Sequence, residues 1–269
     1  MRNMLETYWR LIAVQIRSQA SYRANFFVEF LASVLSTAMV FISLAFVFER
    51  FGNIAGWDLG DVAFLYGMVE AAFGLMDMFF SGFDPQNFGL QVRLGRLDQI
   101  LLRPIRVTLQ VIGSEFLLRR LGRILQGLVI LLWALQRVEI TWTVAKVLYF
   151  PIVFVSMIAF FGGLFVIGST LTFWTFESVE IVNIFTYGGS EMMSYPMHIY
   201  PAGLRRFFTY VIPAIFLNYY PAIYFLNKPD PFGMPGWVLF LSPVAGFGVL
   251  FVAGLFWRYG LRRYQSSGT

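Results

Sequence analysis

The sequence predicts an all-α integral membrane protein with six transmembrane helices. Of its 269 residues, 58% are hydrophobic and 13% are charged, which is about half the charge density of an ordinary soluble domain. Several runs approach 20 mostly apolar residues, the length that a helix needs to cross the hydrocarbon core. Arginines gather at the ends of these runs and are rare inside them, as expected of segments that cross a bilayer.

Four stretches are long and apolar enough to be spans by themselves. They are residues 26–48, 62–82, 147–174 and 237–257. A shorter apolar run, residues 121–135, reaches the required length when it is extended back to residue 111. We therefore expect a further span there, one that begins with charged turns.

The region between residues 179 and 226 allows two topologies. In the first, residues 179–195 cross the membrane, and the proline-rich part after Tyr200 forms re-entrant or surface helices. In the second, only residues 207–226 cross. Both give six crossings, so both termini are expected on the same side.

The distribution of arginine predicts which side that is. Arginines precede the first span, recur between residues 93 and 123, and close the chain at residues 258–263. Cytoplasmic loops carry an excess of basic residues, so we expect both termini and the loop of residues 83–108 in the cytoplasm. The pair Arg205 and Arg206 breaks this pattern under the re-entrant topology and favours its rival.

The sequence argues against several kinds of site. It has no cysteine, which excludes disulfides, thiolate metal sites and cysteine nucleophiles. Its nearest approach to a phosphate-binding loop, residues 163–170, lacks the lysine and lies in an apolar run, where glycines favour close helix packing. His198 has no second ligand at metal-binding spacing, so no metal is expected. The net charge of +5 is assigned to the cytoplasmic membrane face and not to nucleic acid binding.

Two acidic residues lie inside the second predicted span. Glu70 and Asp77 are seven residues apart, close to two helical turns, so they share one face of the helix. Ionisable groups in hydrocarbon mark ion or substrate pathways by default. Lining of a pathway and structural polar packing both stay open, whereas a proton relay would need further such groups on other spans.

A short amphipathic helix is predicted in the cytoplasmic loop. Between Gly95 and Pro104, the apolar residues Leu97, Ile100 and Leu101 fall at positions i, i+3 and i+4, and Pro104 disfavours helix at the residue before it. Such a helix either rests on the inner leaflet or docks into a partner.

This segment also carries a resemblance. The string from Gly95 to Pro104 is similar to the G-x-L-D-x-x-L-L-R-P motif of a permease family in the ABC-2 superfamily. A second similarity is the segment rich in proline and tyrosine before the last span. Its matching residues are Tyr195, Pro196, Tyr200, Pro201, Pro213, Tyr220 and Pro221.

The resemblance implies the permease subunit of an ATP-binding cassette exporter in the bacterial cytoplasmic (inner) membrane. Residues 1–269 would form a single ABC-2 type transmembrane domain, with an amphipathic N-terminal helix in residues 1–25, a coupling helix in the cytoplasmic loop 83–108, and extracellular re-entrant helices in the segment 196–236. The residues that couple to the ATPase would be Gly95, Leu97, Asp98, Ile100, Leu101, Leu102, Arg103 and Pro104.

The resemblance also implies the partners. Two copies of a cytoplasmic ABC ATPase would bind ATP and Mg, so no catalytic residue and no cofactor is expected in this chain. A second permease, related or identical, would complete the complex, and membrane lipids would surround it. The lipid surroundings and aromatic spans favour an amphiphilic or lipid-like cargo. The alternatives are a membrane enzyme acting on lipid-linked substrates and an ion-coupled carrier.

Overall fold

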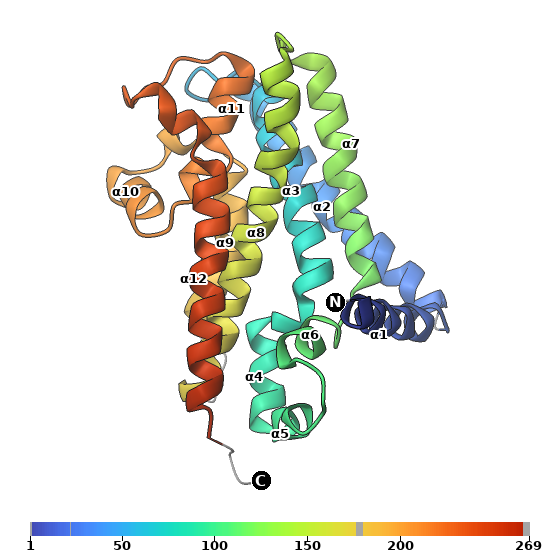
Figure 1. The fold of residues 1–269 in the computed structure, drawn as a ribbon. Helices are drawn as coiled ribbons and strands as arrows, with labels where there is room; N and C mark the ends of the chain where they lie inside the picture. The colour runs from blue at the N-terminus through green and yellow to red at the C-terminus, as the bar shows by residue number, and fades with distance from the viewer. Residues whose placement is uncertain (1, 22, 176–179, 266–269) are drawn as a thin grey trace.

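The computed structural model describes residues 2–21, 23–175 and 180–265. Within these ranges the chain consists of α-helices joined by short 3-10 turns and loops, with no β-strand (Figure 1). The long helices stand side by side. They are α2 (Arg23–Phe51), α3 (Leu59–Phe80), α7 (Leu121–Arg137), α8 (Val144–Thr175) and α12 (Ser242–Arg263).

The helix α3 is the centre of this bundle. It packs along α7 on one side and against α8 on the other, while α8 packs along α12. Almost every residue of α3 is buried, including its three acidic residues, Asp61, Glu70 and Asp77. By contrast, α2 buries few of its side chains and presents large apolar residues such as Phe27, Leu35 and Phe46 outward. This exposed apolar surface suits a helix that faces lipid.

Glycines let the long helices approach closely. A methyl group at Gly246 of α12 would lie 2.2 Å from the carbonyl oxygen of Ser156 on α8, and one at Gly127 of α7 would lie 2.5 Å from the amide nitrogen of Ala71 on α3. Gly163 on α8 similarly faces the backbone of α12. The glycines of the 163–170 segment therefore act in helix packing, a use of small residues that is common between membrane helices.

Four stretches of the described chain are long and apolar enough to cross a membrane. They are Phe26–Phe51, Leu59–Arg93, Val144–Thr175 and Ser242–Arg263. These stretches confirm the four long apolar runs read from the sequence. The last helix begins five residues later than expected, because a 3-10 turn, η5 (Gly236–Phe240), occupies the start of that run.

The expected extension of α7 back to residue 111 was wrong. The chain forms α6 (Val107–Ile112), leaves the helix, and re-enters it through η2 (Leu118–Arg120). The backbone groups freed by this break bind two glutamines of α1 (Arg2–Ser21). Gln15 donates to the carbonyl of Ser114 at 2.7 Å, and Gln19 donates to that of Phe116 and accepts from the amide of Leu118 at 3.0 Å.

Both ends of the described chain and the predicted cytoplasmic loop lie at one end of the bundle (Figure 1). There α1 lies across the ends of the long helices, next to α4 (Pro85–Arg93), α5 (Arg96–Leu101) and α6. In α1, Ile12 is buried, whereas Trp9, one turn earlier, is exposed.

The opposite end holds a group of short helices. They are η3 (Met197–Ile199), α10 (Ala202–Tyr210), η4 (Ala214–Phe216) and α11 (Tyr219–Leu226), reached through α9 (Glu180–Met193). The chain bends by 77° between α10 and the segment Ala214–Leu226. Residues 207–226 are therefore not one continuous helix, because Pro213 has no N–H to extend the ladder of α10.

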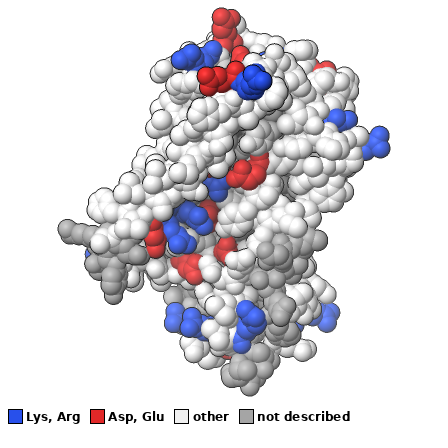
Figure 2. Space-filling model, turned by 180° about the vertical axis from the view of Figure 1, so that it is seen from behind, with Lys and Arg blue, Asp and Glu red and all other residues white. Residues whose placement is uncertain are grey.

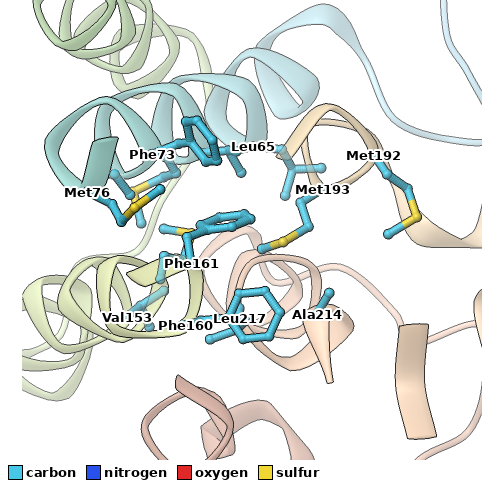
Figure 3. Close-up of a cluster of buried hydrophobic side chains, with 14 of the residues drawn as sticks. Leu65, Phe73, Met76, Val153, Phe160, Phe161, Met192, Met193, Ala214 and Leu217 are labelled. Atoms are coloured by element: carbon cyan, nitrogen blue, oxygen red, sulfur yellow. The ribbon is translucent and has the colours of Figure 1, made fainter. Parts of the chain in front are cut away.

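A buried apolar cluster joins the short helices to the bundle (Figure 3). It contains Leu65, Phe73, Met76, Val153, Phe160, Phe161, Met192, Met193, Ala214 and Leu217. Beside it, the buried side chain of Asn218 donates to the carbonyls of Leu65 at 3.1 Å and Met193 at 3.0 Å. One amide thus ties the turn before α11 to both α3 and α9.

The contact of α8 with α12 yields a prediction. Gly246→Ala forces α12 away from the Ser156 carbonyl, so we expect a loss of stability of about 1 to 3 kcal/mol, the usual range for overpacking. Thermal unfolding of the purified protein in detergent measures it. Gly254 lies on the same helix with open space around it, so Gly254→Ala should unfold at the wild-type temperature or above. Equal unfolding temperatures for the two variants would contradict the close contact.

Candidate functional site

The predicted amphipathic helix is present as α5, at the same end of the molecule as α4 and α6. Asp84 begins α4 by accepting hydrogen bonds from the amides of Gln86 at 3.0 Å and Asn87 at 3.2 Å. Gly95 has a φ of 65° and turns the chain between α4 and α5. This left-handed conformation favours glycine, which accounts for the residue at the start of the motif.

The apolar stripe of α5 divides into an inner and an outer part. Leu97 is 1% exposed and packs in the main core, and Ile100 is half-buried against it. Leu101 is 41% exposed and Leu102 is 87% exposed. The structure therefore gathers all eight predicted coupling residues at one end, but Leu97 supports the helix from within while Leu101 and Leu102 face outward.

Hydrogen bonds from a buried glutamine fix the shape of the loop after α5. Gln110 of α6 is buried, and its side chain donates to the carbonyls of Ile100 at 3.0 Å and Ile105 at 2.8 Å. These two bonds close the loop that carries Leu102, Arg103 and Pro104, all exposed. Sequence reasoning missed Gln110, since nothing in its local pattern signals a loop ten residues earlier. We name the exposed residues 101–104 the tip.

Asp98 has a neighbour within the chain. It faces Tyr264, just beyond the end of α12, and burial together with the nearby Asp98 carboxylate raises the pKa of Tyr264 to about 12. The ring of Tyr264 packs on Phe173 of α8, with centroids 5.4 Å apart. Asp98 thus belongs to the junction between α5 and the end of α12, whereas the tip carries the outward-facing residues of the motif.

Glu70 and Asp77 share one face of α3, as predicted, and that face meets α7. Glu70 forms a two-pronged ion pair with Arg123, with distances of 2.6 Å to Nε and 2.7 Å to Nη2. Asp77 pairs with Nε of Arg120 at 2.7 Å. Both carboxylates are 1% exposed. Arg123 also lies over the ring of Phe73 at 4.4 Å, so the geometry favours structural pairing over free lining of a pathway.

The two arginine partners were not found from the sequence. The sequence places Arg120 and Arg123 in the charged turns that begin the predicted span of residues 111–135. Their spacing does carry a signal, because two arginines three residues apart share a helix face. Matching them to Glu70 and Asp77 requires knowing that α3 and α7 are antiparallel neighbours.

Further charged residues surround these pairs on one flank of the bundle. We name this the charged flank, made of Glu29, Arg119, Arg120, Arg123 and Glu191. The two arginine side chains paired to α3 are 25% and 13% exposed, and Arg119 lies 3.7 Å from Glu29. Glu191 of α9 is exposed. Figure 2 shows acidic and basic side chains gathered midway along this face as well as at the two ends.

The predicted re-entrant residues lie in the segment of short helices, where the contacts of this segment are structural hydrogen bonds. Tyr200 donates to the carbonyl of Met192 at 3.2 Å. His198 hydrogen-bonds the hydroxyl of Tyr219 at 2.8 Å and the carbonyl of Ala55 at 3.1 Å, a structural role that ties this segment to the loop before α3. Among the described residues, no group of three His, Asp or Glu could hold a metal ion. The other motif residues lie in the same segment: Tyr195, Pro196, Pro201, Pro213, Tyr220 and Pro221.

The ion pairs of α3 can be tested by a double-mutant cycle. Glu70→Gln leaves Arg123 buried without its counter-charge, and we expect it to destabilise the protein by about 3 to 5 kcal/mol. Combining it with Arg123→Gln should restore part of that loss. Thermal unfolding in detergent is the measurement. Glu29→Gln, which alters a half-exposed pair, should change stability by less than about 1 kcal/mol, and additive effects of the two buried substitutions would refute the pairing.

Comparison with known proteins identifies the family of the chain. Residues 34–268 match the family model described as ABC-2 family transporter protein. No curated protein matches the chain. The matched region contains α3 with its ion pairs, the tip and the short helices α10 and α11. The chain therefore belongs to the ABC-2 family of transporter proteins and is a multi-pass membrane component of an ABC transporter.

Proposed function

We propose that this chain is the permease subunit of an ABC exporter that moves an amphiphilic or lipid-like substrate. Two copies of a cytoplasmic ATPase would bind and hydrolyse ATP with Mg, and this chain would convert their motion into a change of the transport pathway. The observation that carries the proposal is the tip, whose two exposed leucines are held in a fixed shape at the end of the molecule that also holds both ends of the described chain.

The topology that fits this role has six crossings in the bacterial cytoplasmic (inner) membrane. They are α2, α3, α7, α8, α9 and α12, with α10 and α11 as a re-entrant segment on the outside. Together η2 and α7 give 20 continuous residues, enough for a span. The positive-inside rule puts the end with α1, α4, α5 and α6 in the cytoplasm, because most arginines lie there.

The tip is suited to dock into an ATPase. Leu102 is 87% exposed and Leu101 is 41% exposed, and large apolar side chains exposed on a loop that hydrogen bonds hold in one shape are typical of a binding anchor. Gln110 limits the freedom of the loop, so force applied at the tip passes into the helices. Through α4 and η1 (Ser81–Phe83) it reaches α3, and through Asp98 and Tyr264 it reaches α12.

The charged flank supports a second permease, related or identical, on this side. Exposed ions are costly in hydrocarbon, so a flank with arginines and Glu191 midway along the bundle requires protein or water beside it. A pathway between two permeases supplies both. The pairing of Glu70 and Asp77 with arginines also argues against the ion-coupled carrier, since each carboxylate is already bound by a cation of the same chain.

Two leucines, Leu97 in α5 and Leu102 just after it, allow docking and folding to be tested separately. Leu102→Ala should leave stability within about 0.5 kcal/mol, as for an exposed site, but weaken coupling by about 2 kcal/mol, roughly thirtyfold. Leu97→Ala should instead destabilise the chain by about 2 to 5 kcal/mol. The measurements are thermal unfolding of the chain and substrate-stimulated ATP hydrolysis by the assembled complex. Wild-type coupling in Leu102→Ala would remove the tip from the mechanism.

Cysteine labelling tests the topology, because the native chain has no cysteine. Gly203→Cys on α10 occupies open space and should react with a membrane-impermeant maleimide added outside intact cells. Gln99→Cys, exposed on α5, should react only after the membrane is opened. Labelling of Gln99→Cys from outside, or protection of Gly203→Cys, would overturn the proposed orientation.

A further inference from the structure

The arginine pair on α10 is out of place in the proposed topology. Basic residues favour the cytoplasmic side, yet Arg205 and Arg206 lie at the end of the molecule proposed to be external. Arg205 is half-buried and Arg206 is exposed. Among the described residues, neither forms an ion pair. Two adjacent guanidinium groups without a carboxylate partner call for another explanation.

Both arginines line a cavity of about 320 Å³. The other lining residues are Thr209, Tyr210, Ile215, Tyr220, Phe232 and Met234. Arg205 lies over the ring of Phe232 at 4.4 Å, which positions its guanidinium while leaving in-plane N–H groups for another acceptor. Asp230 is the acidic residue in the adjoining loop. Its carboxylate accepts hydrogen bonds from the backbone amides of Phe232 and Met234, at 3.1 and 2.7 Å, and forms no ion pair with either arginine among the described residues.

A second cavity, of about 500 Å³, lies between α8, α12 and the turn after α10. Its walls include Leu164 of α8, Val244 and Gly248 of α12, and Pro213 of the turn, and no charged residue lines it. Both cavities fall in the range of about 300 to 1,000 Å³ typical of small-molecule sites. The second one offers hydrocarbon contacts alone.

The turn between α10 and α11 lies between the two cavities. Tyr210 lines the arginine cavity, and the next residue, Val211, lines the apolar one. Likewise, Ile215 lines the arginine cavity and the next residue, Phe216, lines the apolar one. Tyr210 is 74% exposed and Val211 is 66% exposed, so a ligand can pass over them along the surface. A cationic cavity beside an apolar one matches a molecule with an anionic head and a hydrocarbon tail.

We propose that this region binds an anionic amphiphile, a lipid whose phosphate headgroup contacts Arg205 and Arg206 and whose acyl chain enters the cavity between α8 and α12. The inference rests on the proposed function for its place on the external side and deepens it by naming the substrate class. The contacts themselves depend only on the positions of α8, α10 and α12.

Native mass spectrometry of the full chain in detergent tests the headgroup contact. The probes are phosphatidylglycerol and phosphatidylcholine with identical acyl chains. Wild-type protein should retain phosphatidylglycerol preferentially, and Arg205→Gln combined with Arg206→Gln should weaken that binding about tenfold to a hundredfold, as expected when charged hydrogen bonds are lost. The matched control is Arg50→Gln, which removes an exposed arginine outside both cavities and should keep the preference.

The acyl-chain contact has its own variant. Gly248→Leu places a side chain in the apolar cavity, and the added Cβ meets no atom within 4 Å, so the helix keeps its path. This variant should lower retention of both lipids, whereas Gly254→Leu, also in open space on α12 but outside the cavity, should not.

Three results would overturn the proposal. They are equal retention of the two lipids by wild-type protein, unchanged phosphatidylglycerol binding in the double arginine variant, and full displacement of the lipid by inorganic phosphate, which would make the site one for small anions. Unchanged lipid binding with loss of oligomers in Gly248→Leu would assign this face to a second copy of the chain and would also refute the proposal. Lipid binding is measured without ATP or ATPase. A failure of the proposed coupling to the ATPase would therefore not change the result of this experiment.

Discussion

The position of α3 between α7 and α8 depends on neutralising two carboxylates in the middle of the bundle. An uncompensated ion buried in low dielectric costs several kcal/mol, so α3 can be buried at Glu70 and Asp77 only if cations reach both. Arg123 and Arg120 do so from a neighbouring antiparallel helix. Because each arginine must meet its own carboxylate, the pairs define the register of α7 along α3.

That register has consequences at the end of the bundle that holds α1 and α5. Arg120 belongs to the turn just before α7, so the pair with Asp77 brings the break between α6 and α7 against the end of α3. The glutamines of α1 then bind the free backbone groups of this break. The helices α4, α5 and α6 follow directly from α3, which places the tip under the most buried helix of the protein. A displacement of the tip has a short route to α3 for this reason.

At the other end, buried hydrogen bonds organise the structure together with the ion pair between Lys228 and Asp61, at 2.5 Å. Asn218 joins the turn before α11 to α3 and α9, and Lys146 of α8 donates to the carbonyl of Phe225 at 2.9 Å and to Asn227 at 2.8 Å. These contacts stabilise the segment in which the chain bends by 77° between α10 and residues Ala214–Leu226. Irregular backbone at membrane depth is tolerated where protein covers it, which these contacts provide. The two cavities proposed to bind a lipid flank this same turn.

The amino-acid sequence by itself determined the all-helical membrane class, four of the long helices and the short helix at Arg96–Leu101. It did so because apolar run length, arginine placement and the 3.6-residue period are local properties. The family was also recognisable from local motifs around Gly95 and Pro213. Only the tertiary structure decided the partners of Glu70 and Asp77, the break before α7 and the division of the α5 stripe into buried Leu97 and exposed Leu101. Each of these depends on which helices are neighbours, and that is decided by contacts between residues far apart in the chain.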